Sequence, residues 1–234
     1  MVRVEGIMSN IIGITLARGG SKGVPGKHTR ILCGKPVIAW TIEEVLKSKL
    51  IEQYAVSSDS DDILDVARQY NVMAIKRPIE LARDNTPTLP ALLHAVDYMG
   101  SARYVAEIRA TSPLKTVEDI DGVVWKLIEN NADSAIGVTL MQDHHPSRMK
   151  WMDHKDYLHD FIPEPRSGRR QDCTPTAYIR NGTVYALKTP IRKLFGHRCS
   201  IGYVIPEERS INIDTEIDYK LCEILMKERL QCFG

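Results

Sequence analysis

Short apolar runs and helix-type apolar spacing alternate along the first 140 residues of the chain. The apolar runs predict strands at 11–16, 54–56, 72–75, 104–108 and 134–138. Between them, apolar residues recur at helical spacing in 38–46, 61–70, 88–98 and 117–129. Strands that alternate with helices are typical of parallel strands joined by helical crossovers. The pattern therefore predicts a three-layer α/β/α fold with a mostly parallel sheet.

The alternation stops between about residues 141 and 175. His144-His145-Pro146, Trp151-Met152 and Pro165 favour turns and a hairpin over another strand–helix unit. Regular patterning returns in predicted strands at 178–187 and 201–205 and in a final helix at 215–229. Because the chain shows no repeat, low-complexity tract or flexible linker, we interpret 1–234 as one domain with an inserted arm at about 141–175.

Composition places the chain among ordinary soluble globular proteins, with 234 residues, 43% hydrophobic residues and a net charge of +1. No stretch approaches the roughly 18 uninterrupted apolar residues of a membrane helix. The first ten residues hold no apolar signal-peptide core. The five cysteines are scattered and never form a CxxC pair, which argues against a disulfide scaffold and a structural zinc site. We expect a cytoplasmic protein with no membrane partner.

The near-neutral total hides a local excess of positive charge. No acidic residue lies between Glu5 and Glu43, while five basic residues do: Arg18, Lys22, Lys27, Arg30 and Lys35. This excess predicts a site for an anion, whereas the neutral total argues against a protein that coats nucleic acid. The alternative is a solvated basic surface.

The segment from Leu16 to Lys27 follows the first predicted strand and holds four glycines. Glycines allow a backbone to approach a ligand closely with its N–H groups turned inward, and the cations supply charge. Loops at the carboxyl ends of parallel strands are where open α/β sheets bind ligands. The spacing fits neither a GxGxxG motif nor a Walker loop. The alternative is a glycine-rich turn with incidental lysines.

Ala17-Arg-Gly-Gly-Ser-Lys-Gly-Val-Pro-Gly-Lys27 resembles the nucleotide loop of the acylneuraminate cytidylyltransferases, which activate sialic acids. An ordered series of further motifs extends the resemblance over nearly the whole chain after about residue 11. These motifs are Ser57-Ser-Asp59, Arg77-Pro-Ile-Glu-Leu-Ala82, Asp84-Asn-Thr86, Thr111-Ser-Pro-Leu114, His144-His-Pro146, Arg170-Gln171, Asn181-Gly182 and Ile213-Asp-Thr-Glu-Ile-Asp218. The resemblance implies a nucleotide-diphospho-sugar transferase-like fold with a dimerisation arm.

In that family the glycine loop wraps CTP, and Arg18 and Lys27 match the residues that hold its phosphates. The full set of residues that the resemblance places at the nucleotide is Leu16, Ala17, Arg18, Gly19, Ser21, Lys27, His28, Arg77 and Thr88. His28 stands where an asparagine is usual. Arg77 could instead form an ion pair with Glu80 or Asp84, and Thr88 could simply begin a helix.

Asn212 and Asp214 are two residues apart, so on a strand they would share one face. Their oxygens suit Mg²⁺, which commonly binds one or two carboxylates together with substrate phosphates. The family pattern often has Asp at both positions. We therefore predict Mg²⁺ as the cofactor, with Asp214 as its main ligand, a smaller contribution from Asn212, and catalysis by Arg18, Lys27 and Asp214. The alternative is that Asp214-Thr215 caps the last helix.

The acceptor side departs further from the family. Ile108-Arg-Ala-Thr-Ser-Pro113 places Arg109 where sialic acid enzymes have a sugar-facing glutamine. The residues that we predict at the sugar are Arg109, Thr111, Arg170, Asn181 and Tyr185. Arginines match a carboxylate bidentately, although a dimerising arm would also use them. Arg109 could instead pair with a nearby carboxylate such as Glu107 or Asp84 and not contact the sugar. The histidines at 144, 145, 154 and 159 fit no standard zinc site.

The resemblance implies transfer of CMP from CTP to the anomeric hydroxyl of a nonulosonic acid, with release of pyrophosphate. The partners would be CTP, the sugar acid and, through the arm, a second copy in a homodimer, with no nucleic acid. One alternative is a related nucleotidyltransferase that uses another nucleotide or sugar acid. A second is a non-catalytic polyanion-binding protein.

Overall fold

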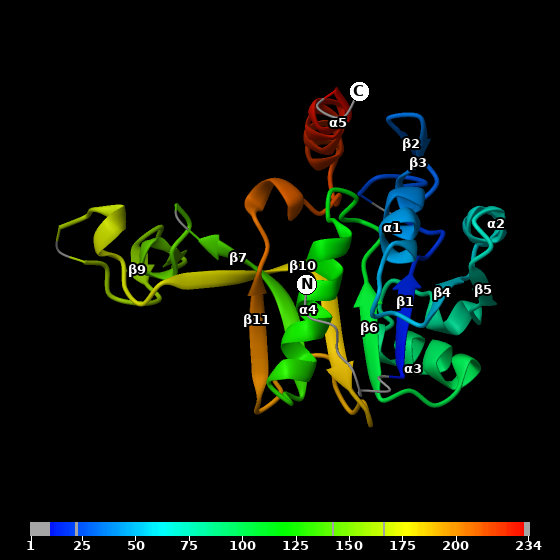
Figure 1. Cartoon of the computed structure of the whole chain (residues 1–234). Helices are drawn as coiled ribbons and strands as arrows, with labels where there is room; N and C mark the ends of the chain where they lie inside the picture. The colour runs from blue at the N-terminus through cyan, green and yellow to red at the C-terminus, as the bar shows by residue number, and fades with distance from the viewer. Residues whose placement is uncertain (1–9, 22, 142, 166, 232–234) are drawn as a thin grey trace.

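A seven-stranded sheet forms the centre of the computed structural model, which describes residues 10–21, 23–141, 143–165 and 167–231 (Figure 1). The strand order is β11-β7-β10-β6-β1-β4-β5. Neighbouring strands are parallel except where β10 runs antiparallel to β6 and β7. The predicted mostly parallel sheet is confirmed. The strands are β1 (Ile11–Leu16), β4 (Gln53–Ser58), β5 (Met73–Lys76), β6 (Tyr104–Ile108), β7 (Ser134–Met141), β10 (Ala177–Lys188) and β11 (Ser200–Val204).

Helices cover both faces of this sheet. One face packs against α1, α2 and α4, and the other packs against α3. The helices are α1 (Val37–Leu46), α2 (Asp61–Gln69), α3 (Thr88–Met99), α4 (Val117–Glu129) and α5 (Glu216–Gln231). Short hairpins are formed by β2 (Ile31–Leu32) with β3 (Lys35–Pro36), and by β8 (Lys150–Met152) with β9 (Leu158–Asp160). The 3₁₀ turns are η1 (Ile79–Leu81), η2 (Pro146–Arg148), η3 (Arg170–Asp172) and η4 (Glu207–Arg209).

Strand β1 shows why the first apolar run does not alternate with polar residues. Ile11 packs with Ile120 of α4 on one face of the sheet, whereas Ile12 and Ile14 pack with Leu92 of α3 on the other. Because successive side chains of a strand point to opposite faces, a strand covered on both sides needs an unbroken apolar run. Core side chains therefore cover both faces of the sheet, and the ends of its strands are the part that can hold a functional site.

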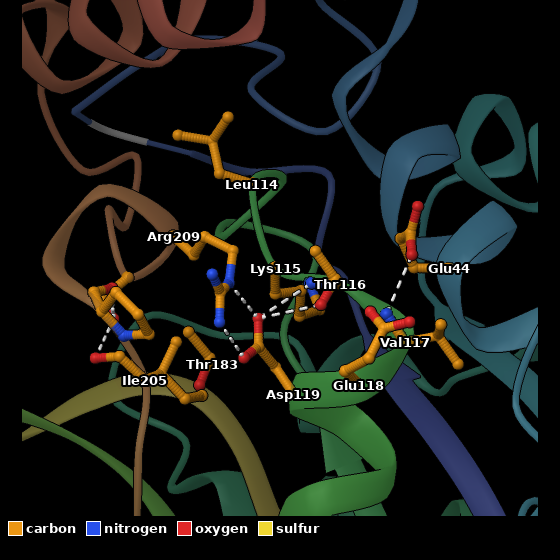
Figure 2. A network of polar contacts seen from close by, with 12 residues as sticks. Glu44, Leu114, Lys115, Thr116, Val117, Glu118, Asp119, Thr183, Ile205 and Arg209 are labelled. Carbon is orange, nitrogen blue, oxygen red and sulfur yellow. Dashed lines mark hydrogen bonds and ion pairs between the residues drawn. The ribbon is translucent and has the colours of Figure 1, made fainter. Parts of the chain in front are cut away.

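A buried polar network anchors the segment between β11 and α5 against the start of α4. Asp119 is fully buried and accepts hydrogen bonds from Nε and Nη2 of Arg209, both at 2.9 Å (Figure 2). The same carboxylate accepts from the backbone N–H of Thr116 at 3.0 Å. Glu44 of α1 accepts from the backbone N–H of Val117 at 2.9 Å. These bonds fix the chain that leads into residues 210–214.

The arm projects from one side of the sheet, where the ends of β7 and β10 run beyond its body (Figure 1). The register of β10 on β7 shifts between Arg180 and Tyr185, and Gly182 adopts a positive φ of 71° within that shift. The β8–β9 hairpin confirms the hairpin predicted for this stretch. Large apolar side chains are exposed on and beside the arm, namely Met149, Trp151, Met152, Tyr157, Leu158, Phe161, Ile162, Tyr178 and Ile179.

Candidate active site

A cleft of about 320 Å³ opens at the carboxyl ends of β1 and β6. Its walls come from the glycine loop after β1, the segment before α3, the turn after β6 and the chain before α5. The structure brings most of the predicted residues together here. Those that line the cleft are Leu16, Arg18, Ser21, Lys27, His28, Arg77, Thr88, Arg109, Thr111, Asn212 and Asp214. Lys22 lies outside the described residues.

The glycine loop passes directly against the backbone of Asp214. A Cβ atom on Gly23 would lie 2.1 Å from the carbonyl oxygen of Asp214, so only glycine fits this position. The Lys27 ammonium donates to the Ile213 carbonyl at 2.7 Å and forms an ion pair with Asp214 at 3.1 Å. Two segments about 190 residues apart in sequence therefore build one wall of the cleft.

Asp59, at the end of β4, links the glycine loop to Arg77. Its Oδ1 accepts from the backbone N–H of Gly19 at 3.0 Å and lies 3.8 Å from Nη2 of Arg77. Arg77 is 5% exposed, and this burial lowers the pKa of its guanidinium. Sequence analysis weighed Glu80 and Asp84 as partners of Arg77 and missed Asp59. Asp84 instead binds Arg18 at 2.5 Å.

His28 is an uncharged ring among cations. Burial lowers its pKa from 6.5 to about 3, and the charges of Lys27, Arg77 and Arg18 add to the effect. The side chain lines the cleft, and its Nδ1 has no hydrogen-bond partner among the described residues. At neutral pH it presents a hydrogen-bonding edge without positive charge.

Asn212 and Asp214 lie in an irregular segment rather than on the strand that their spacing suggested. They are nevertheless side by side, since the Asn212 amide donates to the Asp214 carboxylate. Asp218 caps α5 by accepting from the backbone N–H groups of Asp214 (3.0 Å) and Thr215 (2.7 Å). The helix-cap alternative for Asp214-Thr215 is confirmed for Thr215, whose hydroxyl accepts from the backbone N–H of Asp218 at 3.3 Å. The Asp214 carboxylate faces Lys27 instead.

Arg109 lies between an acidic side chain and an aromatic ring. Its Nε is 3.4 Å from Oε1 of Glu107, and its guanidinium lies 5.2 Å from the ring centre of Tyr185. The pairing with Glu107 raises the pKa of Arg109. Its side chain remains 33% exposed at the cleft wall. Of the predicted sugar contacts, Arg109 and Thr111 line the cleft. The Tyr185 ring lies against the Arg109 guanidinium.

Arg170 and Asn181 are not brought to this cleft within one chain. Arg170 binds Asp143 at 2.7 Å and lines a separate hollow on the arm with His145 and Cys173. Asn181 accepts from the Thr183 hydroxyl at 2.7 Å and donates to two further hydroxyl groups, so its amide is engaged inside the sheet.

The amides of Ala17 and Gly19 are also already bonded. Ala17 is buried and donates to the Ser57 carbonyl at 3.0 Å, and the Gly19 amide donates to Asp59. These two N–H groups are therefore engaged within the protein and do not face the cleft as free donors.

The arm histidines have other partners. His145 contacts the Ser147 hydroxyl and the Pro175 carbonyl, and His159 pairs with Asp153 and stacks on Trp151. The described part of the chain holds no group of three or more His, Cys, Asp or Glu side chains placed to bind a metal.

Lys115 is a residue that sequence analysis missed. It is fully buried, and its ammonium donates to the Thr41 hydroxyl (2.7 Å), the Arg109 carbonyl (2.7 Å) and the Ser112 carbonyl (2.8 Å). Burial lowers the pKa of this lysine to about 7. It clamps the turn that carries Arg109 and Thr111. No sequence signal could have found it, because its burial arises from tertiary packing.

Glu107 was expected only as an alternative partner of Arg109, and the pairing is confirmed, but its burial was not foreseen. It is the one charged residue in the otherwise apolar strand β6, and it is 2% exposed. Burial raises the pKa of its carboxyl group. An ionisable side chain in a central strand is unusual enough to flag.

Buried polar atoms without hydrogen-bond partners gather in this cleft. Among the described residues they include Nδ1 of His28, Nε of Arg77, Oε2 of Glu107, Nε of Arg109 and Oδ1 of Asn212. Buried polar atoms are nearly always bonded, and those that are not are expected where a ligand completes them. The cleft is thus built for a polar, anionic ligand.

The cytidylyltransferase family model matches residues 12–160. The chain belongs to the cytidylyltransferase family, which confirms the resemblance drawn from the motifs.

Individual relatives are more distant. The chain is 27% identical to the post-translational flagellin modification protein B of Campylobacter coli, over 95% of this chain and 97% of that protein. It is 27% identical to the N-acylneuraminate cytidylyltransferase of Escherichia coli O18:K1:H7 and 26% identical to that of Oncorhynchus mykiss. These matches cover 94% and 100% of this chain but 53% of each relative, so the chain spans about half their length.

Two solved structures share the fold. A CMP:2-keto-3-deoxy-manno-octonic acid synthetase complexed with CTP superposes with a TM-score of 0.73 at 15% identity, covering 94% of this chain and all of that one. A 4-diphosphocytidyl-2C-methyl-D-erythritol synthase from Anaerococcus prevotii gives 0.62 at 18% identity, covering 94% and 99%. The predicted nucleotide-sugar-transferase-like architecture is confirmed.

Proposed function

We propose that this cytidylyltransferase transfers CMP from CTP to the anomeric hydroxyl of a nonulosonic acid and releases pyrophosphate. The observation that carries the proposal is the gathering of Lys27, Arg18 and Arg77 with Asp214 in one cleft at the ends of the parallel strands. The N-acylneuraminate cytidylyltransferase relatives support this acceptor class. The alternative of a non-catalytic polyanion-binding protein gains no support from a cleft this confined.

The cations hold the triphosphate in this proposal. Lys27 and Arg18, now paired with Asp214 and Asp84, exchange these carboxylates for phosphate oxygens when CTP binds. The acceptor hydroxyl oxygen attacks the α-phosphorus, the bond to the bridging oxygen breaks, and pyrophosphate leaves with the electron pair. The hydroxyl proton passes to water. The two cations stabilise the charge that develops on the leaving group.

The donor set at Asn212 and Asp214 fits Mg²⁺. Asp214 supplies a carboxylate that is 64% exposed, and Oδ1 of Asn212 is a buried oxygen with no hydrogen-bond partner among the described residues. A site with so few protein ligands matches an ion that arrives with substrate phosphates. Bound there, Mg²⁺ would supply Lewis-acid polarisation of the α-phosphate. Lys27, which now neutralises Asp214, would then be released toward the phosphates.

The acceptor is proposed to differ from ordinary N-acetylneuraminic acid. A glutamine both donates and accepts hydrogen bonds, whereas Arg109 only donates and carries a permanent charge. Its guanidinium lines the cleft, which supports contact with the sugar acid. A diamino or deoxy nonulosonic acid is the acceptor class that we favour.

The exposed apolar side chains of the arm support a homodimer in which the arms pack on the partner. Arg170, on the arm, would then reach the partner's cleft rather than its own. None of the described helices is both long and apolar enough to cross a membrane. We propose a cytoplasmic site of action, where CTP is made available.

Pyrophosphate release with CTP and Mg²⁺ against a panel of ulosonic acids tests the function. We expect turnover with at least one nonulosonic acid and none with buffer alone. Thermal stabilisation by CTP with Mg²⁺, compared with heparin, separates a nucleotide site from a polyanion site. Equal stabilisation by heparin and no pyrophosphate with any sugar acid would overturn the proposal.

A further inference from the structure

Glu107 is a carboxylate in the interior of the sheet, and the cations that act on it are Arg109 and the buried Lys115. It lies in β6, between β1 and β10, and its side chain is 2% exposed. Removing a carboxylate from water is costly unless partners compensate for the lost hydration. One of its oxygens has no hydrogen-bond partner among the described residues. An apolar residue would serve the core better, so the carboxylate needs a functional reason.

The neighbours of Glu107 supply that reason. Arg109 is two residues further along, so the two side chains leave the sheet on the same face. Tyr185 lies opposite Glu107 in the antiparallel β6–β10 register and shares that face. The Arg109 backbone N–H donates to the Thr183 carbonyl at 2.9 Å, and its carbonyl accepts from Lys115. Both the backbone and the guanidinium of Arg109 are therefore held.

We propose that Glu107 is a positioning residue that, with the Tyr185 ring, fixes Arg109 as the determinant of acceptor specificity. The proposal rests on the proposed function and assigns a role to a residue outside the nucleotide site. Glu107 and Arg109 then act as one unit at the acceptor end of the cleft.

A fixed guanidinium recognises a carboxylate or hydroxyl pair better than a free one, because less side-chain freedom is lost on binding. Glu107 also keeps Arg109 away from competing charges. Asp214 attracts Arg109 electrostatically, and the CTP phosphates would attract it more strongly. Without Glu107, the arginine is free to turn toward the nucleotide or the metal ligand and leave the acceptor unrecognised.

A double-mutant cycle of Glu107→Gln and Arg109→Gln tests this coupling, with N-acetylneuraminic acid and a diamino nonulosonic acid as probes. In the wild-type background, Glu107→Gln should raise the KM of the better acceptor about tenfold, as expected for contacting residues, and leave the KM of CTP unchanged. In the Arg109→Gln background the same change should have less than about a twofold effect. Equal effects in both backgrounds, or an equal rise in the KM of CTP, would overturn the proposal.

Asp119→Asn is the matched control, because Asp119 is also a buried carboxylate paired with an arginine. It should lower the melting temperature and leave the acceptor ranking intact. Glu107→Gln should leave the melting temperature unchanged or raise it. A melting temperature that falls as far as in Asp119→Asn would make Glu107 a structural residue and overturn the proposal.

A second measurement separates this inference from the proposed function. In ¹⁵N-labelled protein, the Nε–H resonance of Arg109, assigned by its loss in Arg109→Gln, should shift and exchange faster in Glu107→Gln. If no sugar acid is turned over but the resonance shifts, the proposed function fails and the positioning role stands. A resonance unaffected by Glu107→Gln overturns the positioning role whatever the activity.

Discussion

Lys27 in the cleft and Lys150 in the arm are both paired with acidic side chains, but their surroundings differ. The Lys27 side chain is 11% exposed and also binds the Ile213 carbonyl. Lys150 is 27% exposed and lies between Asp160 and Glu164 on the arm. The first pair joins distant segments around a cavity, whereas the second only ties one hairpin together.

Apolar side chains show the same contrast. Around the cleft they are buried in clusters on both faces of the sheet, as for Ile14 and Ala17. On the arm, Trp151 is 45% exposed and Leu158 is 67% exposed. The cleft is thus completed largely by its own chain, whereas the arm presents apolar surface that nothing in the described part of the chain covers. We expect substitutions in the cleft to reduce catalysis and substitutions in the arm to weaken assembly.

Lys27→Ala should give the largest effect. Loss of a cation that is stabilising in the transition state costs about 2–4 kcal/mol, or on the order of 10²–10³ in kcat, by analogy with oxyanion-hole donors. Lys150→Ala is the matched control and should change kcat less than about twofold. Steady-state pyrophosphate release with CTP measures both. A near-native rate for folded Lys27→Ala would refute the assignment.

Asp214→Asn should lower kcat by about 10² and weaken the dependence on Mg²⁺, because it removes the only charge of the proposed ligand pair. Asn212→Ala should do noticeably less, since no charge is lost. Asp65→Asn, which breaks an exposed carboxylate–arginine pair on α2, controls for general electrostatics. Magnesium titrations of the initial rate provide the comparison. Equal losses in Asp214→Asn and Asn212→Ala without unfolding would contradict the asymmetric site.

Arg109→Gln should shift relative kcat/KM toward N-acetylneuraminic acid by about 1–3 kcal/mol, because it restores a side chain that both donates and accepts. Competition between N-acetylneuraminic acid and a diamino nonulosonic acid measures the ratio directly. Two results would count against this prediction: a wild type that already prefers N-acetylneuraminic acid, or a ranking that the substitution leaves unchanged.

Leu158→Asp tests the arm. A charge placed on an apolar contact should weaken the homodimer on the order of tenfold or more, with little effect on the melting temperature of the monomer. Light scattering over a micromolar concentration series follows the change, and Leu46→Asp, an exposed leucine on α1, serves as the control. A wild-type protein that scatters as a monomer at micromolar concentration would contradict the proposed homodimer.

His28→Asn should give the smallest of these effects, a change in how the free energy of unfolding depends on pH. The pKa of this ring falls from 6.5 in the unfolded chain to about 3 in the fold. Between these values only the unfolded chain binds the proton, so stability falls as pH drops below 6.5, by at most about 1.4 kcal/mol per pH unit. Denaturant titrations at pH 7 and pH 5.5 should show a difference in wild type that shrinks by on the order of 1 kcal/mol in His28→Asn. An unchanged difference would show that the ring protonates within the fold.

Most of the residues that line the glycine-loop side of the cleft could be predicted from sequence. Its residues lie in contiguous loops, and the glycines and cations of these loops indicate an anion site, as in the segment that holds Arg18 and Lys27. Thr88 and Arg77 followed from the same ordered motifs. The alternation of apolar runs with helical spacing likewise predicted the sheet, because strands covered on both faces must be apolar throughout.

What escaped prediction depends on contacts between distant segments. The pairing of Arg109 with Glu107 could be suggested from their spacing, but the burial of Glu107 and the support from Lys115 could not, because they require knowing that β6 is central and that its turn is buried. Asn181 and Arg170 lie on the irregular return from the arm, where a register shift in β10 decides which way side chains point. The arm was predicted only as a break in the alternation of strands and helices. Exposed apolar residues show no periodicity that would indicate what they pack against.

The contact between Gly23 and Asp214 determines when the cleft can form during synthesis of the chain. The loop that carries Gly23 rests on the carbonyl of Asp214, which is translated about 190 residues later. Until that segment emerges, Lys27 lacks both of its partners and the loop lacks its supporting surface. A released chain truncated before residue 213 should therefore hold every strand of the sheet but lack one wall of the cleft. The cleft can therefore be completed only after Asp214 has been translated.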